Sequence, residues 1–260
     1  MSTFLFDSIV FGPVRSRRLG VSLGINLLPV DRKVCNFNCI YCECGWTYKK
    51  SPDSSPLPSR EEVREALATR LSEMQKKGEK PDVITYAGNG EPTMHPDFAG
   101  IIEDSIELRN IFFPDAKISV LSNGTTIHRR KIREALLKAD MNILKLDSVF
   151  PATIKVLNQN LPSYNLQNVF DNMKLMEGKF IIQTLFVKGE YNGQIIDNTT
   201  REETEPWLEK IRELHPASVM IYTIDRDTPL GNKLHKVPVT VLREIASRVE
   251  ALGIPASVSG

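Results

Sequence analysis

The sequence feature that most limits the fold is an alternation of short apolar runs with longer segments of helical periodicity. Apolar runs of strand length occur at residues 24–30, 82–87, 117–123, 141–149, 179–188 and 218–225. Segments with helical spacing follow or separate them at 60–77, 96–108, 129–139, 201–214 and 240–252. Strands that alternate with helices predict a parallel sheet joined by helical crossovers.

Six such units are two fewer than a closed eight-stranded barrel requires. We therefore expect an α/β fold, a partial (β/α)6 TIM-like barrel with parallel strands and outer helices, formed as a single domain by residues 1–260. A doubly wound open sheet is the alternative that periodicity alone leaves open. Both folds place ligands at the carboxyl ends of their strands, where polar residues of this chain gather. The first long helix should begin after Ser59, which forms a capping box with Glu62.

Composition limits the class of protein. The chain has 260 residues, is 41% hydrophobic and 25% charged, and has a net charge of +1, which is typical of a soluble globular protein. A charge this small gives no overall footprint for nucleic acid or membrane. No apolar run approaches the ~18 residues of a membrane span, and the N-terminus lacks the charge order of a signal peptide. We expect a cytoplasmic protein that does not bind membranes.

All four cysteines, Cys35, Cys39, Cys42 and Cys44, fall within ten consecutive residues. A disulfide framework would spread its cysteines along the chain, because bridges that close long loops constrain the unfolded state most. Four thiols in one loop (residues 35–44) instead indicate a thiophilic metal centre in a reducing compartment.

The first three cysteines have the spacing C-x3-C-x2-C. Three thiolates on one loop can hold three corners of a [4Fe–4S] cube and leave one iron without a protein ligand. With Tyr41 directly before Cys42, this motif resembles that of the radical S-adenosylmethionine (SAM) superfamily. The resemblance implies cluster ligands at Cys35, Cys39 and Cys42, and SAM bound at the open iron. It also implies reductive cleavage of SAM to a 5′-deoxyadenosyl radical, which abstracts hydrogen from a substrate.

Other metal sites remain as alternatives. Zinc also takes four thiolates, but its ligands usually come in two pairs separated by a dozen residues or more, and here a single residue separates Cys42 from Cys44. A ferredoxin-like carrier would use Cys44 as a fourth ligand, yet such a module does not need 260 residues. We expect Cys44 to lie near the cluster without binding it.

A glycine-rich turn follows the second expected strand and reads Gly88-Asn89-Gly90-Glu91-Pro92. Alone it indicates a tight turn. Beside the cysteine loop it resembles the Gly-Gly-Glu element of the same superfamily, with Asn89 in place of the first of two adjacent glycines. The resemblance implies that Gly88, Asn89, Gly90 and Glu91 bind SAM. The glycines would let the backbone approach the methionine, and the carboxylate would accept its ammonium group.

Further SAM-binding positions follow from the resemblance. Ser122 and Asn123 fall where related enzymes bind the ribose or the methionine carboxylate, although a polar turn after a strand is the other interpretation. Tyr41 would contact adenine. Asp147 resembles an aspartate that glycyl-radical activases use on the ribose, but Val149 stands where those enzymes carry lysine. Lys145 shares a strand face with Asp147 and needs a carboxylate partner such as Asp147 or Glu91.

A basic element at residues 12–26 precedes the cysteine loop. With the Gly-Asn-Gly-Glu-Pro turn, it resembles the radical SAM group that includes the wybutosine-type tRNA-modifying enzymes. This makes RNA or another phosphate-bearing molecule a candidate substrate. Phosphate could bind at a rim of basic side chains, or the charges could simply be solvated. These side chains are Arg15, Arg17, Arg18, Lys188 and Arg226.

The leading interpretation is thus a monomeric radical SAM enzyme with one cluster, served by an electron donor such as flavodoxin or ferredoxin. No second all-cysteine cluster can form, because only Cys44 is left over. One alternative is a glycyl-radical-enzyme activase. The other is a zinc-stabilised nucleic-acid-binding module without redox chemistry. The sequence assigns no catalytic side chain.

Overall fold

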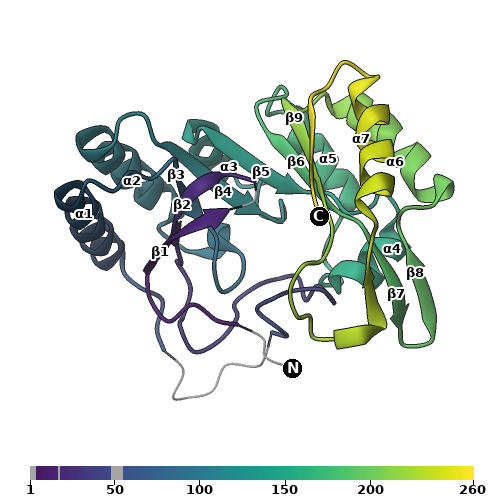
Figure 1. Cartoon of the computed structure of the whole chain (residues 1–260), viewed down its shortest axis with the longest axis horizontal. Coiled ribbons are helices and arrows are strands. Elements are labelled where there is room, and N and C mark those ends of the chain that lie inside the picture. Colours follow the sequence, from purple (N-terminus) through teal and green to yellow (C-terminus); the bar gives the residue numbers. More distant parts are fainter. Residues whose placement is uncertain (1–3, 17, 48–54) are drawn as a thin grey trace.

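The computed structural model describes residues 4–16, 18–47 and 55–260, and these form an α/β fold around an eight-stranded sheet (Figure 1). The strands lie in the order β1-β2-β3-β4-β5-β6-β9-β11. Their bounds are β1 Val10–Ser16, β2 Gly20–Ile25, β3 Val83–Tyr86, β4 Lys117–Ser122, β5 Met141–Lys145, β6 Ile181–Leu185, β9 Ser218–Tyr222 and β11 Ala256–Ser259.

The pairings from β2 through β11 are all parallel, and only β1 pairs antiparallel, with β2. The sheet curls into a half-barrel with helices around it, which confirms the expected partial TIM-like barrel. Parallel strands bring their carboxyl ends to one edge, so the loops that follow β2, β3, β4 and β5 meet there.

The helices connect successive strands and lie outside the curl of the sheet (Figure 1). Their bounds are α1 Arg60–Lys77, α2 Phe98–Phe112, α3 Arg130–Lys138, α4 Pro151–Asn158, α5 Leu166–Lys174, α6 Arg201–Leu214 and α7 Val239–Glu250; short 3-10 turns occur at Pro92–Met94 (η1) and Gly231–Lys233 (η2). The expected capping box is present at α1, where Ser59 and Glu62 bond each other's backbone N–H. No helix of the described residues is long and apolar enough to cross a membrane.

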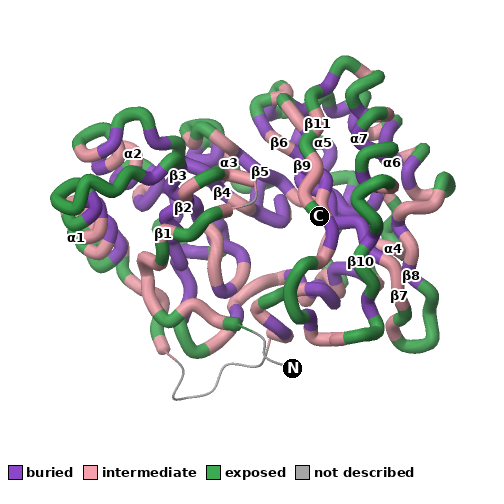
Figure 2. Tube along the Cα trace, viewed as in Figure 1, coloured by how far each residue is buried: buried purple, intermediate pink, exposed green. Residues whose placement is uncertain are grey.

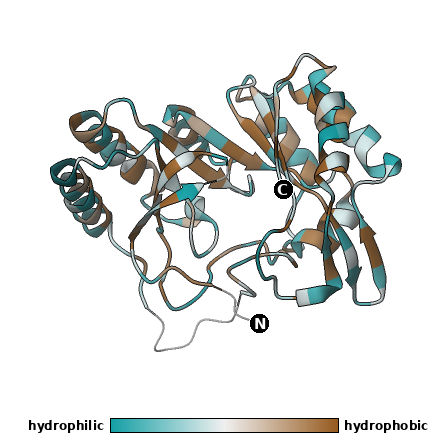
Figure 3. Cartoon of the chain, in the orientation of Figure 1, coloured by the Kyte–Doolittle hydropathy of each residue, from teal (hydrophilic) through white to brown (hydrophobic). Residues whose placement is uncertain are grey.

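The main core lies between the sheet and these helices. Residues facing the sheet recur at helical spacing on α1, as Val63, Leu67, Leu71 and Met74, which are all buried. Figure 2 shows buried residues concentrated in the sheet and on the inner sides of the helices. Figure 3 shows the complementary pattern in hydropathy, with hydrophobic strands and a largely hydrophilic α1.

A second apolar cluster fixes the cysteine loop to the rest of the molecule. It joins Phe37, Ile40 and Tyr41 of the loop to Leu157 of α4 and to residues of a small antiparallel sheet. That sheet has the order β10-β7-β8, with β7 Val187–Tyr191, β8 Gln194–Asp197 and β10 Leu234–Lys236. The loop is therefore packed on two sides by elements from the second half of the chain.

The first barrel strand differs from the expectation. The predicted strand at 24–30 is observed at Gly20–Ile25, and the chain turns after it. The Asn26 side chain accepts a hydrogen bond from Leu28 N at 3.2 Å and donates one to Leu28 O at 2.8 Å, which takes Leu28 out of the ladder. β1 and β11 were not predicted, and β11 adds a further parallel strand at the end of the barrel.

Candidate iron–sulfur site

The cysteine loop follows β2 and is held in two places by backbone hydrogen bonds. Val34 N donates to Asn89 O at 2.8 Å, and Glu91 N donates to Val34 O at 3.0 Å. Further along the loop, Asn38 N and Ile40 N donate to the carbonyls of Asn158 and Leu157 at 2.8 and 3.0 Å. The loop thus joins the glycine-rich turn to the carboxyl end of α4.

The thiols of Cys35, Cys39 and Cys42 line one cavity of about 340 Å³ at the carboxyl edge of the barrel. The same cavity is lined by most of the residues expected to bind SAM: Tyr41, Gly88, Gly90, Glu91, Ser122 and Asn123. Three thiols and a set of polar groups around one cavity fit a [4Fe–4S] cluster with SAM beside it. Among the residues described, no three Cys, His, Asp or Glu side chains converge on one point, as a single zinc ion would require.

The electrostatic surroundings of the thiols differ. Burial raises the pKa of Cys35 to about 12 and also raises the pKa of Cys39. The pKa of Cys42 is lowered, first because the Cys44 thiol hydrogen-bonds to it, and also because the ammonium of Lys33 is near. Lys33 is 3% exposed, and its Nζ donates to Gly45 O at 3.0 Å. Lys33 therefore places a buried positive charge beside the three thiols, where cluster sulfurs would be negative.

Cys44 lies at the same cavity, and its Sγ donates to Gly88 O at 3.2 Å. Its pKa is raised, mainly by the hydrogen bond to Cys42. That Cys44 does not bind the cluster stays a prediction.

Positions 88 and 90 require glycine because the backbone there lies very close to Asn26 and Val34. Both have φ angles of the kind glycine favours, 139° and 137°. A Cβ on Gly90 would lie 1.9 Å from Val34 O, and one on Gly88 would lie 2.6 Å from Asn26 Oδ1. These glycines let the turn lie directly against the cysteine loop.

Asn89, the residue between these glycines, is fully buried and bonds the protein itself. Its Nδ2 donates to Phe6 O and Pro29 O at 2.9 and 2.8 Å, while its Oδ1 accepts from Phe6 N at 2.9 Å. Asn89 does not line the cavity. Its side chain fixes the N-terminal segment against the turn.

Glu91 is 2% exposed and lies at the cavity wall. Its Oε1 accepts from Ser122 Oγ at 2.8 Å and from the hydroxyl of Thr93, and its Oε2 accepts from Asn123 N at 2.7 Å. Burial raises its pKa, although the hydrogen bonds act in the opposite direction. No cation among the described residues forms an ion pair with Glu91. The cavity therefore presents a buried carboxylate whose charge the protein does not balance.

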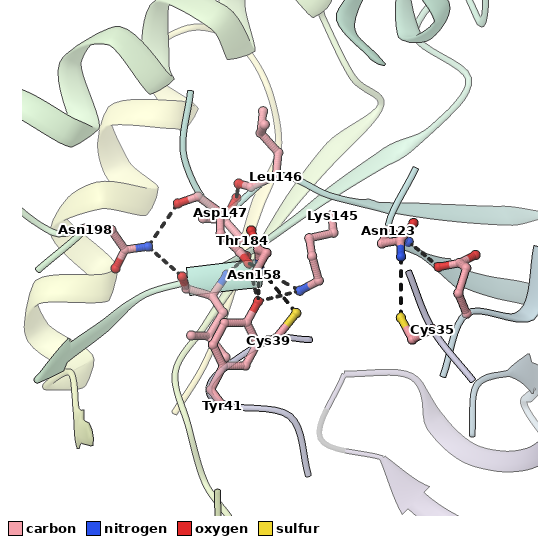
Figure 4. Close-up of polar contacts among 12 residues, drawn as sticks. Cys35, Cys39, Tyr41, Asn123, Lys145, Leu146, Asp147, Asn158, Thr184 and Asn198 are labelled. Atoms are coloured by element: carbon pink, nitrogen blue, oxygen red, sulfur yellow. Dashed lines mark hydrogen bonds and ion pairs between the residues drawn. The ribbon is translucent and has the colours of Figure 1, made fainter. Parts of the chain in front are cut away.

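Ser122 and Asn123, at the end of β4, connect Glu91 with the cysteine loop. Asn123 Nδ2 donates to Asn36 Oδ1 at 2.7 Å and lies 3.7 Å from Cys35 Sγ (Figure 4). Ser122 and Asn123, both predicted as SAM-binding residues, thus connect the Glu91 carboxylate with the part of the cysteine loop around Cys35.

Asp147 and Tyr41 belong to a separate group of contacts around Cys39 (Figure 4). The Asp147 carboxylate accepts from Leu185 N at 3.0 Å, from Asn158 Nδ2 at 2.8 Å and from the hydroxyl of Tyr41. Lys145 Nζ donates to Tyr41 Oη at 2.8 Å and lies 3.5 Å from Asp147. Burial acts to lower the pKa of Lys145, but the Asp147 carboxylate together with Tyr222 and Cys39 raises that pKa overall.

The geometry gives Asp147 a different setting from the one expected. Its side chain is fully buried, its oxygens are bound within the protein, and it does not line the cavity. Asn158 Nδ2 also lies 3.4 Å from Cys39 Sγ, and Asn198 bonds the Asp147 carbonyl at 3.0 Å. Sequence reasoning missed Asn158, since α4 was not predicted, and missed Lys33, although it stands two residues before Cys35.

Among the described residues, the expected rim of basic side chains is present only in part. Arg226 pairs with Glu43 at 2.9 Å, and Lys188 pairs with Asp197 at 3.0 Å. Arg15 is exposed, and Arg17 lies outside the described residues. Arg226 and Arg18 line the cavity, and Arg18 forms no ion pair within the described parts of the chain.

Comparison with known proteins gives the family. Residues 32–198 match the radical SAM superfamily. GTPase Obg of Brachyspira hyodysenteriae is 32% identical over 223 residues, which cover 84% of this chain and 30% of that protein. UPF0026 protein MJ1312 of Methanocaldococcus jannaschii is 31% identical over 239 residues, covering 89% of this chain and 67% of that protein. The chain thus spans under a third of the first relative's length and two thirds of the second's.

Solved structures show the same fold. Streptococcus suis SuiB bound to S-adenosylmethionine has a TM-score of 0.61 at 15% identity, over 88% of this chain and 49% of SuiB. TYW1, a protein of wybutosine synthesis, has a TM-score of 0.60 at 14% identity, over 88% of this chain and 73% of TYW1; that structure holds a lysine–pyruvate adduct. By the family match, this chain is an enzyme of the radical SAM superfamily, whose cofactors are a [4Fe–4S] cluster and SAM.

Proposed function

We propose that Cys35, Cys39 and Cys42 each bind one iron, and that SAM binds the fourth. The observation that carries this proposal is the convergence of three thiols from one loop and the unbalanced Glu91 carboxylate on a single cavity. When bound, the cluster supplies the electron that cleaves SAM to methionine and a 5′-deoxyadenosyl radical, which takes hydrogen from a substrate.

Glu91 is proposed to accept the ammonium group of the methionine moiety. A buried carboxylate without a cation partner is costly, and a bound ammonium would supply the missing charge. Ser122 and Asn123 hold the carboxylate at 2.8 and 2.7 Å, so it can meet this ligand without rearranging. Gly88 and Gly90 keep the adjoining backbone free of side chains.

Asp147 is proposed to position the cysteine loop rather than to bind the ribose. Through Tyr41 and Asn158 its carboxylate holds the Cys39 side of the loop, and Lys145 balances its charge. A glycyl-radical activase, which the compact single-cluster build suggested, stays the alternative, but Asp147 as placed here lends it no support. RNA or another phosphate-bearing molecule stays a candidate substrate, and a flavodoxin or ferredoxin a candidate electron donor.

The test is anaerobic reconstitution followed by iron analysis and reduction in the presence of SAM. Wild-type protein should bind close to four irons and release 5′-deoxyadenosine. Cys39→Ala should lose both properties, whereas Cys44→Ala, the matched control, should keep the iron. Equal loss of iron in the two variants would mean that Cys44 is a ligand and that no iron is left open.

A further inference from the structure

Arg18 lies in the turn between β1 and β2 and reaches the cavity that the cysteines line. Its turn is fixed by the Ser16 hydroxyl, which accepts from Arg18 N at 3.2 Å and from Leu19 N at 3.1 Å. Its guanidinium carbon lies 4.7 Å from the centroid of the Tyr222 ring, at the end of β9. An arginine at this distance is held by the face of the aromatic ring while its N–H edge stays available.

The guanidinium is incompletely satisfied by the protein. Its Nη1 is buried and has no hydrogen-bond partner in the described parts of the chain, and no carboxylate there pairs with Arg18. Buried donors of native proteins are nearly always bonded, so one left unbonded in a cavity wall needs an explanation. An acceptor supplied by a ligand is such an explanation.

Other charges at this cavity already have partners. Arg226 is paired with Glu43 at 2.9 Å, Lys145 lies 3.5 Å from Asp147, and Lys33 Nζ donates to Gly45 O at 3.0 Å beside the cysteine thiols. Arg18 therefore differs from them in the same way that Glu91 does: the protein leaves its charge unbalanced. The Glu91 carboxylate lacks a cation partner, and the Arg18 guanidinium lacks an anion partner.

The two unbalanced charges belong to different walls. Glu91 is bonded through Asn123 to the Cys35 side. Tyr222, which holds Arg18, lies on the Cys39 side, since it pairs with Leu185 in the sheet and packs against the apolar cluster that contains Cys39. A ligand at Arg18 would thus lie on the Cys39 side of the cavity, away from the contacts proposed for the methionine.

We propose that Arg18 recognises an oxyanion, a carboxylate or a phosphate, on the substrate of this enzyme. The proposal rests on the function proposed above and narrows its substrate class to molecules with such a group near the hydrogen that is abstracted. The planar guanidinium can bind either oxyanion with two parallel N–H donors, which a lysine ammonium cannot reproduce.

Isothermal titration calorimetry on the reconstituted enzyme with SAM present tests this, with inorganic phosphate in one arm and acetate in the other. At least one anion should bind the wild-type protein, and Arg18→Gln should weaken that binding ~10- to 100-fold, as expected for a charged hydrogen bond. Arg18→Lys should fall between them. Arg15→Gln is the matched control, because Arg15 is exposed on the same hairpin and should bind the anion as the wild type does. The arm that responds identifies the substrate group.

Iron content and SAM affinity are measured on the same samples. If neither anion binds the wild type, or if Arg18→Gln binds it equally well, the proposal is wrong. It is also wrong if Arg18→Gln loses SAM affinity in parallel, since Arg18 would then bind SAM. A wild-type enzyme that fails to cleave SAM refutes the proposed function instead, and the anion titrations still report on Arg18.

Discussion

Glu91 follows β3 and Asp147 follows β5 of the same sheet. Both carboxylates are buried, and the exposed fractions of the two residues are 2% and 3%. Glu91 receives only neutral donors, from Thr93, Ser122 and Asn123, and faces the cavity. Asp147 has Lys145 beside it, is bonded by Asn158 and Leu185 N, and is closed off from the cavity. The comparison separates a carboxylate that is left for a ligand from one that holds the loop in place.

The largest effect should come from breaking the Asp147 side. Asp147→Asn leaves the Lys145 ammonium buried without its counter-charge, and breaking a buried pair from one side costs about 3–5 kcal/mol of unfolding free energy. Urea denaturation of the cluster-free protein measures this. The double variant Asp147→Asn/Lys145→Met should recover part of the loss, because the uncompensated charge is gone. A loss below ~1 kcal/mol in the single variant would mean that the pair is not what holds the loop.

Glu91→Gln should change ligand binding far more than stability. It replaces a charged acceptor with a neutral one, so SAM affinity should fall ~10- to 100-fold, corresponding to about 1.5–3 kcal/mol. Equilibrium binding of SAM to the reconstituted variant is the measurement, with iron content as the check on the cluster. An unchanged affinity would remove Glu91 from the SAM site and with it the contrast between the two carboxylates.

Asn158→Ala should give a smaller loss of stability. The substitution removes one donor that serves Asp147 at 2.8 Å, Tyr41 at 3.1 Å and Cys39 at 3.4 Å. We expect a loss of about 1–3 kcal/mol, the cost of leaving a buried acceptor unsatisfied. In a double-mutant cycle with Asp147→Asn, the two effects should not add, since the residues share one network. Strict additivity would contradict a connected group.

The smallest effect should appear in the pH dependence of stability. Burial raises the pKa of Glu91 in the folded protein, so the folded state holds its proton at pH values where the unfolded chain has lost it. Stability should therefore decrease as pH rises from the usual glutamate pKa to the raised one, and Glu91→Gln should lack this component. Urea titrations of the cluster-free wild type and variant across that window measure it. A difference that runs in the opposite direction would mean that the hydrogen bonds outweigh burial.

Local signals predicted much of the fold. Helix α1 begins at its capping box because Ser59 and Glu62 act within one turn, and α6 has the predicted bounds. β11 was missed because Ala256-Ser-Val-Ser259 is short and half polar, so it is a strand only by pairing with β9. The turn after Ile25 depends on the hydrogen bonds of the Asn26 side chain, which hydrophobic periodicity cannot predict.

The residues of the site likewise divide into those that a local motif predicts and those that only the tertiary structure brings together. The cysteines, Glu91, Ser122 and Asn123 stand in motifs, and the structure brings them to one cavity. The partners of Asp147 come from residues 41, 158 and 185, which no local pattern connects with it. The sequence also does not distinguish Arg18 from Arg226. Only the structure shows that Arg18 lies over the Tyr222 ring, whereas Arg226 forms an ion pair with Glu43.

Electron paramagnetic resonance of the reduced protein, with and without SAM, tests the open iron most directly. If Cys35, Cys39 and Cys42 are the only protein ligands, SAM should change the spectrum of the reduced cluster in the wild type and equally in Cys44→Ala, and the change should weaken in Glu91→Gln. A spectrum that SAM leaves unaltered in the wild type, or a cluster that Cys44→Ala cannot hold, would contradict a three-cysteine site with one iron left for SAM.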